Sequence, residues 1–181
     1  KAEALPTLQG RAQAEPRGAL WASIDFNGRS VQVIITHLGL SRQERMLQVE
    51  ALLGEEWLAN RDSESPTILC GDFNLLPNSP VYRSLISRLR DAQCELRNHQ
   101  PKMTFSGRFP GLRIDHVFID PTIEVVGVKI PRTELIRVAS DHLPLVVDLL
   151  LPPQTEGGKG SGSTPSRNYP RQRRGEARSP S

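Results

Sequence analysis

The chain has 181 residues, enough for one domain with a hydrophobic core but not for several. Hydrophobic residues make up 37% of it, and no apolar run approaches the length of a membrane span, so we expect a soluble protein, cytoplasmic by default. The net charge of +3 arises in residues 157–181, which hold six basic residues and one acidic residue. The rest of the chain is mildly acidic, so the overall charge does not indicate a nucleic-acid-binding surface on the domain.

We expect three parts along the chain. Residues 1–18 are polar, lack the apolar core of a secretory signal, and are predicted to be an irregular segment. Residues 19–151 carry the strand and helix patterns and are predicted to form the folded domain. Residues 152–181, rich in Gly, Ser, Pro and Arg, are predicted to be a disordered basic tail that could contact polyanions weakly.

A β-hairpin is predicted at the start of the domain. Residues 19–26 and 30–36 both read as strands, and Asn27-Gly28 lies between them. Asn-Gly is the strongest short hairpin signal, because both residues tolerate the positive φ angles of a tight turn.

Two helices are predicted in the first half of the domain. Ser41 and Glu44 form a capping box before an amphipathic pattern that covers residues 42–59. Ser79 can cap a second helix, and Pro80 suits its first turn.

The most informative stretch lies between these helices. Residues 67–71 read as a buried strand that ends at Gly71, and Asp72 and Asn74 follow two residues apart. In extended backbone these two side chains would project together from the carboxyl end of the strand, where α/β sheets form ligand crevices. A carboxylate beside a carboxamide suits Mg²⁺ or an attacking water next to a phosphate. The alternative is an Asx-type turn with no chemistry.

Strands dominate the second half of the domain. We predict strands at residues 113–119, 123–130 and 145–151, and a mostly irregular segment at residues 91–104. Together with the two helices, this pattern indicates a mixed α+β domain.

Four short motifs occur in a fixed order. They are Thr36-His37-Leu38, Gly71-Asp72-Phe73-Asn74, Ile114-Asp115-His116 and Ser140-Asp141-His142-Leu143-Pro144. In this order they resemble the endonuclease/exonuclease/phosphatase superfamily, which contains deoxyribonuclease I, abasic-site nucleases, inositol-phosphate phosphatases and sphingomyelinases. The resemblance covers about residues 17–151 and implies a deoxyribonuclease I-like four-layer α/β sandwich, with two mixed sheets face to face and helices outside.

One departure from the superfamily lies at the start of the chain. Its members begin with a strand that ends in Asn and a second strand that carries a metal-binding Glu, and nothing before His37 fits either. The resemblance therefore implies that residues 19–151 are a partial domain, the C-terminal portion without its N-terminal strands. We expect this chain alone to be inactive or weakly active and only marginally stable, since the inner face of its sheet would meet water.

The resemblance implies five catalytic residues: His37, Asp72, Asn74, Asp115 and His142. Asp115 would fix the tautomer of His142, and Asp72 would orient or deprotonate the attacking water. Asn74 and His37 would donate hydrogen bonds to phosphate oxygens. For His37 and His142, the alternative is an ordinary surface histidine.

The resemblance also implies a metal site. Asp72, Asn74 and Asp141 are its expected ligands, with Mg²⁺ as the expected ion and Mn²⁺ as an alternative. The cation would neutralise the phosphate during hydrolysis.

Three further residues near the motifs are not nominated. His116 follows Asp115 directly, so it should point away from it and serve packing or lie on the surface. His99 lies in an irregular stretch. Arg113 could reach a substrate phosphate, but a structural ion pair explains it at least as well.

We therefore predict a divalent-metal-dependent phosphoester hydrolase, either a phosphodiesterase or nuclease, or a phosphatase. His37 in place of an aromatic residue favours the deoxyribonuclease I and phosphatase branches over the abasic-site nucleases. Nucleic acid, phospholipid and inositol phosphate are not distinguished as substrates. One alternative is a non-catalytic remnant or binding module that keeps the fold without a complete metal site. Another is that the Arg-rich tail recruits the protein to nucleic acid or acidic lipid.

Overall fold

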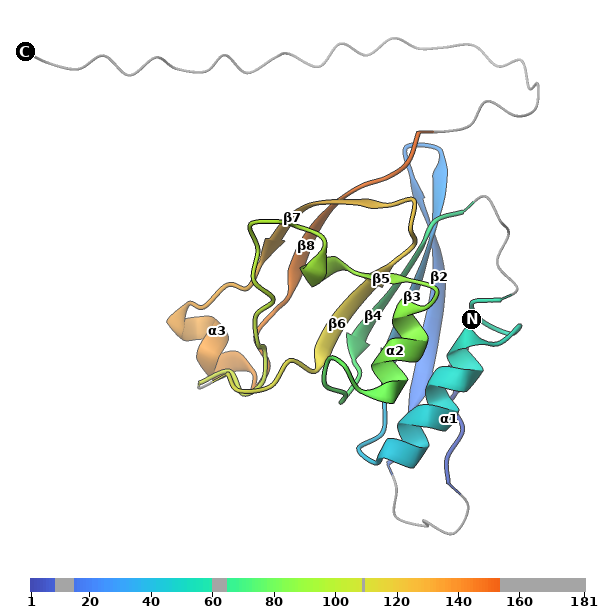
Figure 1. Ribbon diagram of the computed structural model, residues 1–181, viewed down its shortest axis with the longest axis horizontal. Helices are drawn as coiled ribbons and strands as arrows, with labels where there is room; N and C mark the ends of the chain where they lie inside the picture. The colour runs from blue at the N-terminus through green and yellow to red at the C-terminus, as the bar shows by residue number, and fades with distance from the viewer. Residues whose placement is uncertain (9–14, 60–64, 109, 154–181) are drawn as a thin grey trace, which may run out of the picture.

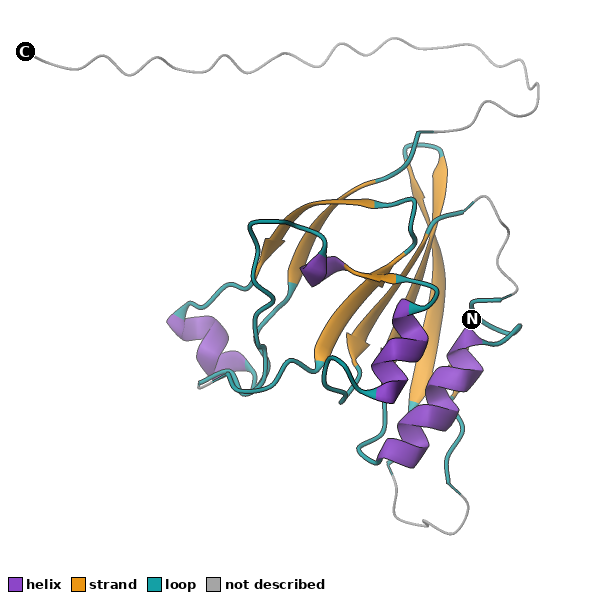
Figure 2. Ribbon diagram, viewed as in Figure 1, coloured by secondary structure: helices purple, strands orange, loops and turns teal. Residues whose placement is uncertain are grey.

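The computed structural model describes residues 1–8, 15–59, 65–108 and 110–153. Its core is a mixed β-sheet with helices on one face and a second, small sheet on the other (Figures 1 and 2). The elements in chain order are β1 (Ala2–Ala4), β2 (Gly18–Phe26), β3 (Arg29–His37), α1 (Arg42–Leu53), β4 (Thr67–Asp72), α2 (Pro80–Ile86), β5 (Arg90–Asp91), the 3₁₀ helix η1 (Ala92–Cys94), β6 (Asp115–Ile119), β7 (Glu124–Lys129), α3 (Glu134–Ala139) and β8 (Val146–Leu150).

The main sheet has six strands in the order β1-β2-β3-β4-β6-β5. β3 and β4 are parallel neighbours, and β4 pairs antiparallel with β6. The predicted hairpin is confirmed, because β2 and β3 pair antiparallel through a turn in which Asn27 has φ 55° and Gly28 has φ 78°. β7 and β8 pair only with each other.

The helices α1 and α2 lie side by side in front of the main sheet (Figure 2). They bury the side chains of Ile34, Leu69 and Phe118, which come from three adjacent strands and are at most 1% exposed. The predicted capping box is confirmed, since the Ser41 hydroxyl accepts a hydrogen bond from the Glu44 N–H at 3.2 Å. The burial of one continuous apolar face fixes both helices on the sheet.

The opposite face of the main sheet is covered only in part. β7 and β8 pack near β6, where Val117 and Ile119 contact the cluster that holds Val147 and Leu149. The part of this face that β2 and β3 form is covered only at one end, where Leu149 and Leu151 line a cavity with Val31, which is 5% exposed. Four large apolar side chains there are 46–59% exposed: Leu20, Ile24, Phe26 and Ile35.

Two local predictions need correction. Residues 1–18 are not wholly irregular, because β1 pairs with β2 and the Leu5 N–H donates to the Arg17 carbonyl at 2.7 Å. Their polar composition shows no strand pattern, and β1 forms because β2 supplies its hydrogen-bonding partners. The predicted helix over residues 42–59 ends at Leu53, since Gly54 is extended. The prediction of a mostly irregular segment at residues 91–104 is confirmed, since it contains only the short η1 and the end of β5.

The later strands are confirmed, but β6 and β7 belong to different sheets. α3, which the sequence did not predict, begins where the Thr133 hydroxyl accepts a hydrogen bond from the Ile136 N–H at 3.2 Å. No helix in the described ranges has both the length and the apolar character that crossing a membrane requires. The predicted basic tail lies outside the described residues, apart from its first two.

Candidate active site

Three predicted site residues form a row at one end of the main sheet. His37 ends β3, Asp72 ends β4 and Asp115 begins β6. In the strand pairing, His37 is the partner of Asp72, and Asp72 is the partner of Asp115. Directly paired residues point to the same face of a sheet, so three motifs far apart in the sequence present their side chains together.

His142 completes this cluster. Its Nδ1 lies 2.8 Å from Asp115 Oδ2, and its Nε2 lies 3.8 Å from Asp72 Oδ2. Asp115 also accepts a hydrogen bond from the Thr104 hydroxyl at 2.5 Å. The carboxylate therefore holds the imidazole with Nδ1–H directed at Asp115, which leaves Nε2 facing Asp72.

Local backbone contacts place His142 against this row, although it follows no strand. Its backbone forms an isolated β-bridge with Phe105, and the two rings lie 4.9 Å apart between centroids. Its N–H donates to the Ser140 hydroxyl at 3.1 Å. Burial lowers the pKa of His142, but the hydrogen bond to Asp115 and the charges of Asp115, Asp72 and Asp141 outweigh burial, so the pKa is raised.

Gly71 lets β4 approach β3 closely just before Asp72. Its φ is +143°, and a Cβ atom there would lie 1.9 Å from the Thr36 carbonyl oxygen. Only glycine fits at such a distance. Asp72 is thereby held with Oδ2 at 3.3 Å from His37 Nε2.

Asn74 does not project beside Asp72 in the predicted way. Its φ is 49°, so the chain turns after the strand instead of remaining extended. Its backbone N–H donates to Asp72 Oδ1 at 2.9 Å, and its side-chain amide donates to the Leu38 carbonyl at 3.0 Å. Asp72 therefore makes an Asx-type turn, and the Asn74 side chain joins the two loops that border the site while still lining the same cavity.

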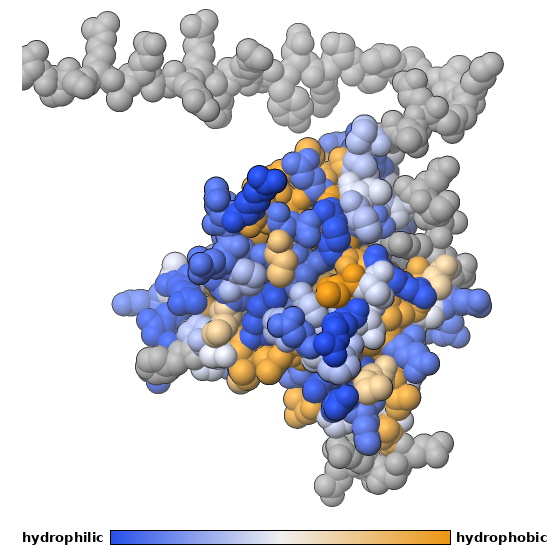
Figure 3. All heavy atoms as spheres, viewed as in Figure 1, coloured by the Kyte–Doolittle hydropathy of each residue, from blue (hydrophilic) through white to orange (hydrophobic). Residues whose placement is uncertain are grey.

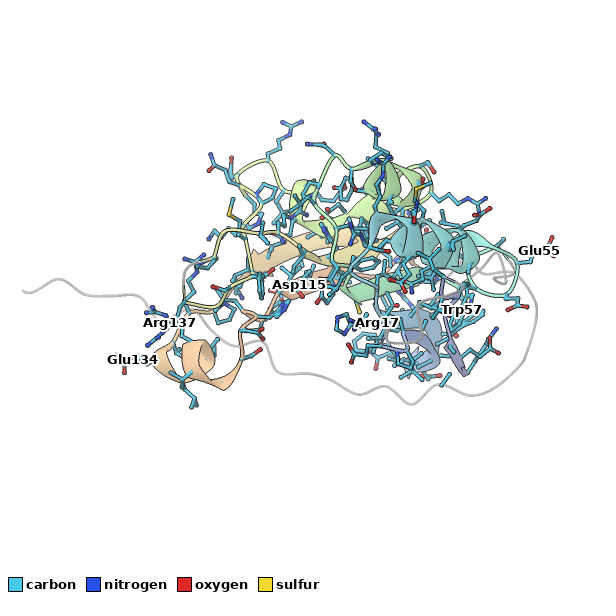
Figure 4. All side chains as sticks on the ribbon, turned by 90° about the horizontal axis from the view of Figure 1, so that it is seen from below. Arg17, Glu55, Trp57, Asp115, Glu134 and Arg137 are labelled. Carbon is cyan, nitrogen blue, oxygen red and sulfur yellow. The ribbon has the colours of Figure 1, made fainter. Side chains whose placement is uncertain are left out.

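Arg17 is a site residue that the sequence did not single out. Its Nη1 lies 2.9 Å from both ring nitrogens of His37, and its Nη2 makes a 2.9 Å ion pair with Glu15. Only 9% of the residue is exposed. Figure 4 shows Arg17 and Asp115 near the middle of this end of the molecule. The only sequence signal was a basic residue just before the first strand of the hairpin.

These side chains surround a cavity of about 680 Å³. Its lining includes His37, Asp72, Asn74, His142 and Arg17. Asp141 is exposed and instead lines a separate cavity of about 470 Å³ with Arg137 of α3. The structure thus brings five of the six predicted site residues together and leaves the Asp141 carboxylate outside the cluster.

The cluster fits a metal ion only in part. Among the described residues, one group is compact enough to hold an ion: Asp72, Asp115 and His142, with ligand atoms within 4.8 Å of one another. Because Asp115 is engaged by His142 and Thr104, Asp72 is the carboxylate best placed for a hard cation. Such a cation takes about six oxygen ligands, so water or substrate oxygens would supply most of them.

The residues that were not nominated serve packing. Arg113 forms a buried ion pair with Asp91, which also accepts a hydrogen bond from the Tyr82 hydroxyl at 2.7 Å. The His116 ring is buried beneath the sheet, and its Nε2 lies 3.0 Å from the Leu75 carbonyl. This buried network lies on the helix side of the main sheet and holds the loop after Asp72 in place. Both structural interpretations of Arg113 and His116 are confirmed.

Comparison with known proteins extends these observations. The sequence pattern of the Endonuclease/Exonuclease/phosphatase family matches residues 10–142. YbhP of Escherichia coli K12, an uncharacterized protein, is 28% identical over 140 residues, which are 76% of this chain and 54% of YbhP. The chain therefore spans about half the length of this relative.

Solved structures share the fold at low sequence identity. The mannosyl-6-phosphatase Bt3783 of Bacteroides thetaiotaomicron matches with a TM-score of 0.62 at 23% identity, over 75% of this chain and 58% of that one. TDP2 of D. rerio, complexed with a single-stranded DNA product, matches with a TM-score of 0.64 at 18% identity, over 83% of this chain and 67% of that one. These matches confirm the predicted fold class.

Proposed function

Because this chain belongs to the Endonuclease/Exonuclease/phosphatase family, we propose that its domain hydrolyses phosphate esters with a divalent cation, Mg²⁺ or alternatively Mn²⁺. The observation that carries the proposal is the Asp115–His142 pair, which faces Asp72 at the end of the sheet. An Asp–His pair beside a further carboxylate is suited to orienting water and handling protons at a phosphate.

Each side chain has a distinct role in this proposal. Asp72 orients the attacking water and accepts its proton, because Oδ2 lies at the centre of the cluster while Oδ1 is held by the Asn74 N–H. Asp115 fixes His142, whose Nε2 donates to a phosphoryl or leaving-group oxygen. His37, which lies beside Asp72, donates to another oxygen of the phosphate.

Arg17 adds a fixed positive charge next to His37. Its guanidinium is largely buried yet lines the cavity, so it loses little conformational entropy when it donates to an anionic oxygen. A cation bound at Asp72 would supply the remaining neutralisation of phosphate charge.

We propose Asp72 as the main metal ligand from this chain. The carboxamide oxygen of Asn74 is a further candidate, because its nitrogen is used by the Leu38 carbonyl. Asp141 stays a prediction, since its side chain would have to turn toward the cluster. The remaining ligands would be water or substrate oxygens.

Two substrate classes follow from the relatives. Bt3783 is named a mannosyl-6-phosphatase, and TDP2 is complexed with a single-stranded DNA product. Phosphate monoesters and nucleic-acid diesters are therefore both candidates here, and phospholipid or inositol phosphate esters remain within the same chemistry.

The proposal is tested by titrating the protein with inorganic phosphate in the presence of Mg²⁺ while following the ring protons of its histidines by NMR. We expect the signals of His37 and His142 to shift, and those of His99 and His116 to stay unchanged as internal controls. Hydrolysis of p-nitrophenyl phosphate and bis-p-nitrophenyl phosphate, with Mg²⁺ and with EDTA, then measures activity.

The outcomes separate the hypotheses. Metal-dependent hydrolysis that EDTA abolishes supports the enzyme. Phosphate binding at His37 and His142 without hydrolysis supports the binding-module alternative for this chain. No response of either histidine to phosphate with metal present would contradict the site.

A further inference from the structure

The candidate active-site cavity has an apolar rim in addition to its polar end. Three leucines line the cavity and are well exposed: Leu40 at 72%, Leu76 at 49% and Leu112 at 41%. They come from three separate loops, after β3, after β4 and before β6. None of them belongs to the two hydrophobic clusters of the core. Figure 3 shows hydrophobic residues along the lower edge of the molecule, between α3 and α1, where such loops lie.

The backbone that carries Leu40 is held in place by neighbouring side chains. The Arg45 guanidinium donates to the carbonyls of Gly39 and Leu40, and the Gln48 side chain accepts from the Gly39 N–H at 2.8 Å. A leucine that is 72% exposed on a loop fixed by buried polar groups gains nothing for folding. This arrangement is typical of a preformed ligand contact.

The other two leucines also lie on anchored backbone. The Leu112 N–H donates to the Phe105 carbonyl at 2.7 Å, and the Leu112 carbonyl accepts from the N–H groups of Thr104 and Phe105 at 3.1 Å. The Leu76 carbonyl accepts from the Ser79 N–H at 3.3 Å. One exposed leucine needs no explanation, but three on fixed loops that line one cavity give that cavity an apolar contact surface.

Two polar side chains of the rim are already engaged in hydrogen bonds, which bears on what the rim can bind. The Asn74 amide donates to the Leu38 carbonyl, and the Ser79 hydroxyl accepts from the Tyr82 N–H at 3.1 Å. Phe105, the one aromatic residue among the described lining residues, lies against His142. Arg42 also lines the cavity and is exposed, so the rim presents one cationic side chain, suited to an anionic oxygen, beside its apolar contacts.

We propose that the preferred substrate is an amphiphilic phosphate ester, whose alcohol carries an aliphatic chain that lies against Leu40, Leu76 and Leu112 while the phosphate occupies the polar end. This inference rests on the proposed function, because the position of the phosphate at His37 and His142 defines where the chain begins. The leucines act as specificity-determining residues and take no part in the chemistry.

The test compares methyl, butyl and octyl phosphate, each as a dispersed monomer with Mg²⁺, by NMR titration. Burying one methylene group fully is worth about fourfold in affinity, and a rim open on one side gives a fraction of that. We therefore expect octyl phosphate to bind at least about tenfold more tightly than methyl phosphate. The methyl signals of the three leucines should shift with octyl phosphate and not with methyl phosphate.

Two sets of variants sharpen the test. The triple variant Leu40→Ser, Leu76→Ser, Leu112→Ser should lose the dependence on chain length and keep its affinity for methyl phosphate. The matched control is Leu135→Ser with Val138→Ser on α3, where both side chains are at least 75% exposed and lie outside the cavity. It should behave as the parent. The single variant Leu40→Ser serves if the triple variant does not fold.

The failures of the two proposals differ. Equal affinity for all three phosphates, with His37 and His142 responding to each, would overturn the aliphatic subsite and leave the phosphoesterase proposal standing. Leucine shifts that octanol reproduces in full, with neither histidine responding to any phosphate, would overturn the phosphoesterase proposal instead.

Discussion

The two faces of the six-stranded sheet are built from the same strands but meet very different surroundings. On β3, Ile34 is 1% exposed and its neighbour Ile35 is 47% exposed. Ile34 packs beneath α1 and α2, whereas the side of the sheet that carries Ile35 has only β7 and β8 nearby, on its far half. The helix face is a closed hydrophobic core, whereas the other face leaves apolar side chains half exposed.

The candidate active site lies on the face that carries Ile35, which is only partly covered and is the open face of the sheet. His37 lies two residues after Ile35 on β3, and Asp72 lies two residues after Cys70 on β4, so each shares a face with a partly exposed apolar residue. The helix face positions the site through strand register and through the buried network behind it. The open face supplies the reacting groups.

The largest expected effect concerns the polar end of the open face. His142→Ala and Asp115→Asn should each lower phosphodiester hydrolysis by several orders of magnitude, because both break the Asp115–His142 pair. His99→Ala is the matched control, since His99 lies outside the cavity. Near-parental turnover in either site variant would contradict the assignment of Asp115 and His142 to the hydrolysis reaction.

The next effect concerns the buried network on the helix face. Burial raises the pKa of Asp91, but contact with His116, the charge of Arg113 and the Tyr82 hydroxyl outweigh burial and lower this pKa from 3.8 to about 2. Asp91→Asn leaves Arg113 buried without its partner, which we expect to cost about 3–5 kcal/mol at pH 7 in urea unfolding.

The same variant has a signature in pH. Because the folded-state pKa of Asp91 is depressed, its stabilisation is present above about pH 4 and is lost as pH falls toward 2. The stabilisation that is lost between pH 4 and pH 2 amounts to about 2 kcal/mol in the free energy of unfolding. The parent should therefore lose more stability than Asp91→Asn between pH 4 and pH 2, and equal losses would contradict the assignment of the pKa.

A matched pair of truncations measures the difference between the two faces directly. Leu69→Ala removes a fully buried side chain from the helix face and should cost about 2–5 kcal/mol in urea unfolding. Ile35→Ala removes a half-exposed side chain from the open face and should cost less than about 1 kcal/mol. Similar losses for both would mean that the open face is covered in solution.

A small effect is also expected at the start of α1. Ser41→Ala removes the hydroxyl that accepts from the Glu44 N–H and should lower the free energy of unfolding by about 1 kcal/mol. Ser41→Asp, which keeps a capping oxygen, is the control. A loss with aspartate as large as that with alanine would show that capping is not the cause.

Local sequence signals determined much of this protein. The Asn27-Gly28 turn, the Ser41 cap and the Ser79-Pro80 helix start are confirmed, because each depends on residues within one turn of chain. The four ordered motifs also indicated the family and the residues of the cluster. These interpretations needed no knowledge of which strand lies beside which.

Only the tertiary structure decided the rest. Arg17 joins the site through pairing of β2 with β3, and Asn74 turns to join the Leu38 loop, neither of which a local pattern can encode. Asp141 lies beside His142 in sequence but faces a different cavity, because the β-bridge to Phe105 sets the orientation of His142. Strand register and loop contacts join residues far apart in the chain, so their outcome depends on packing that sequence periodicity does not contain.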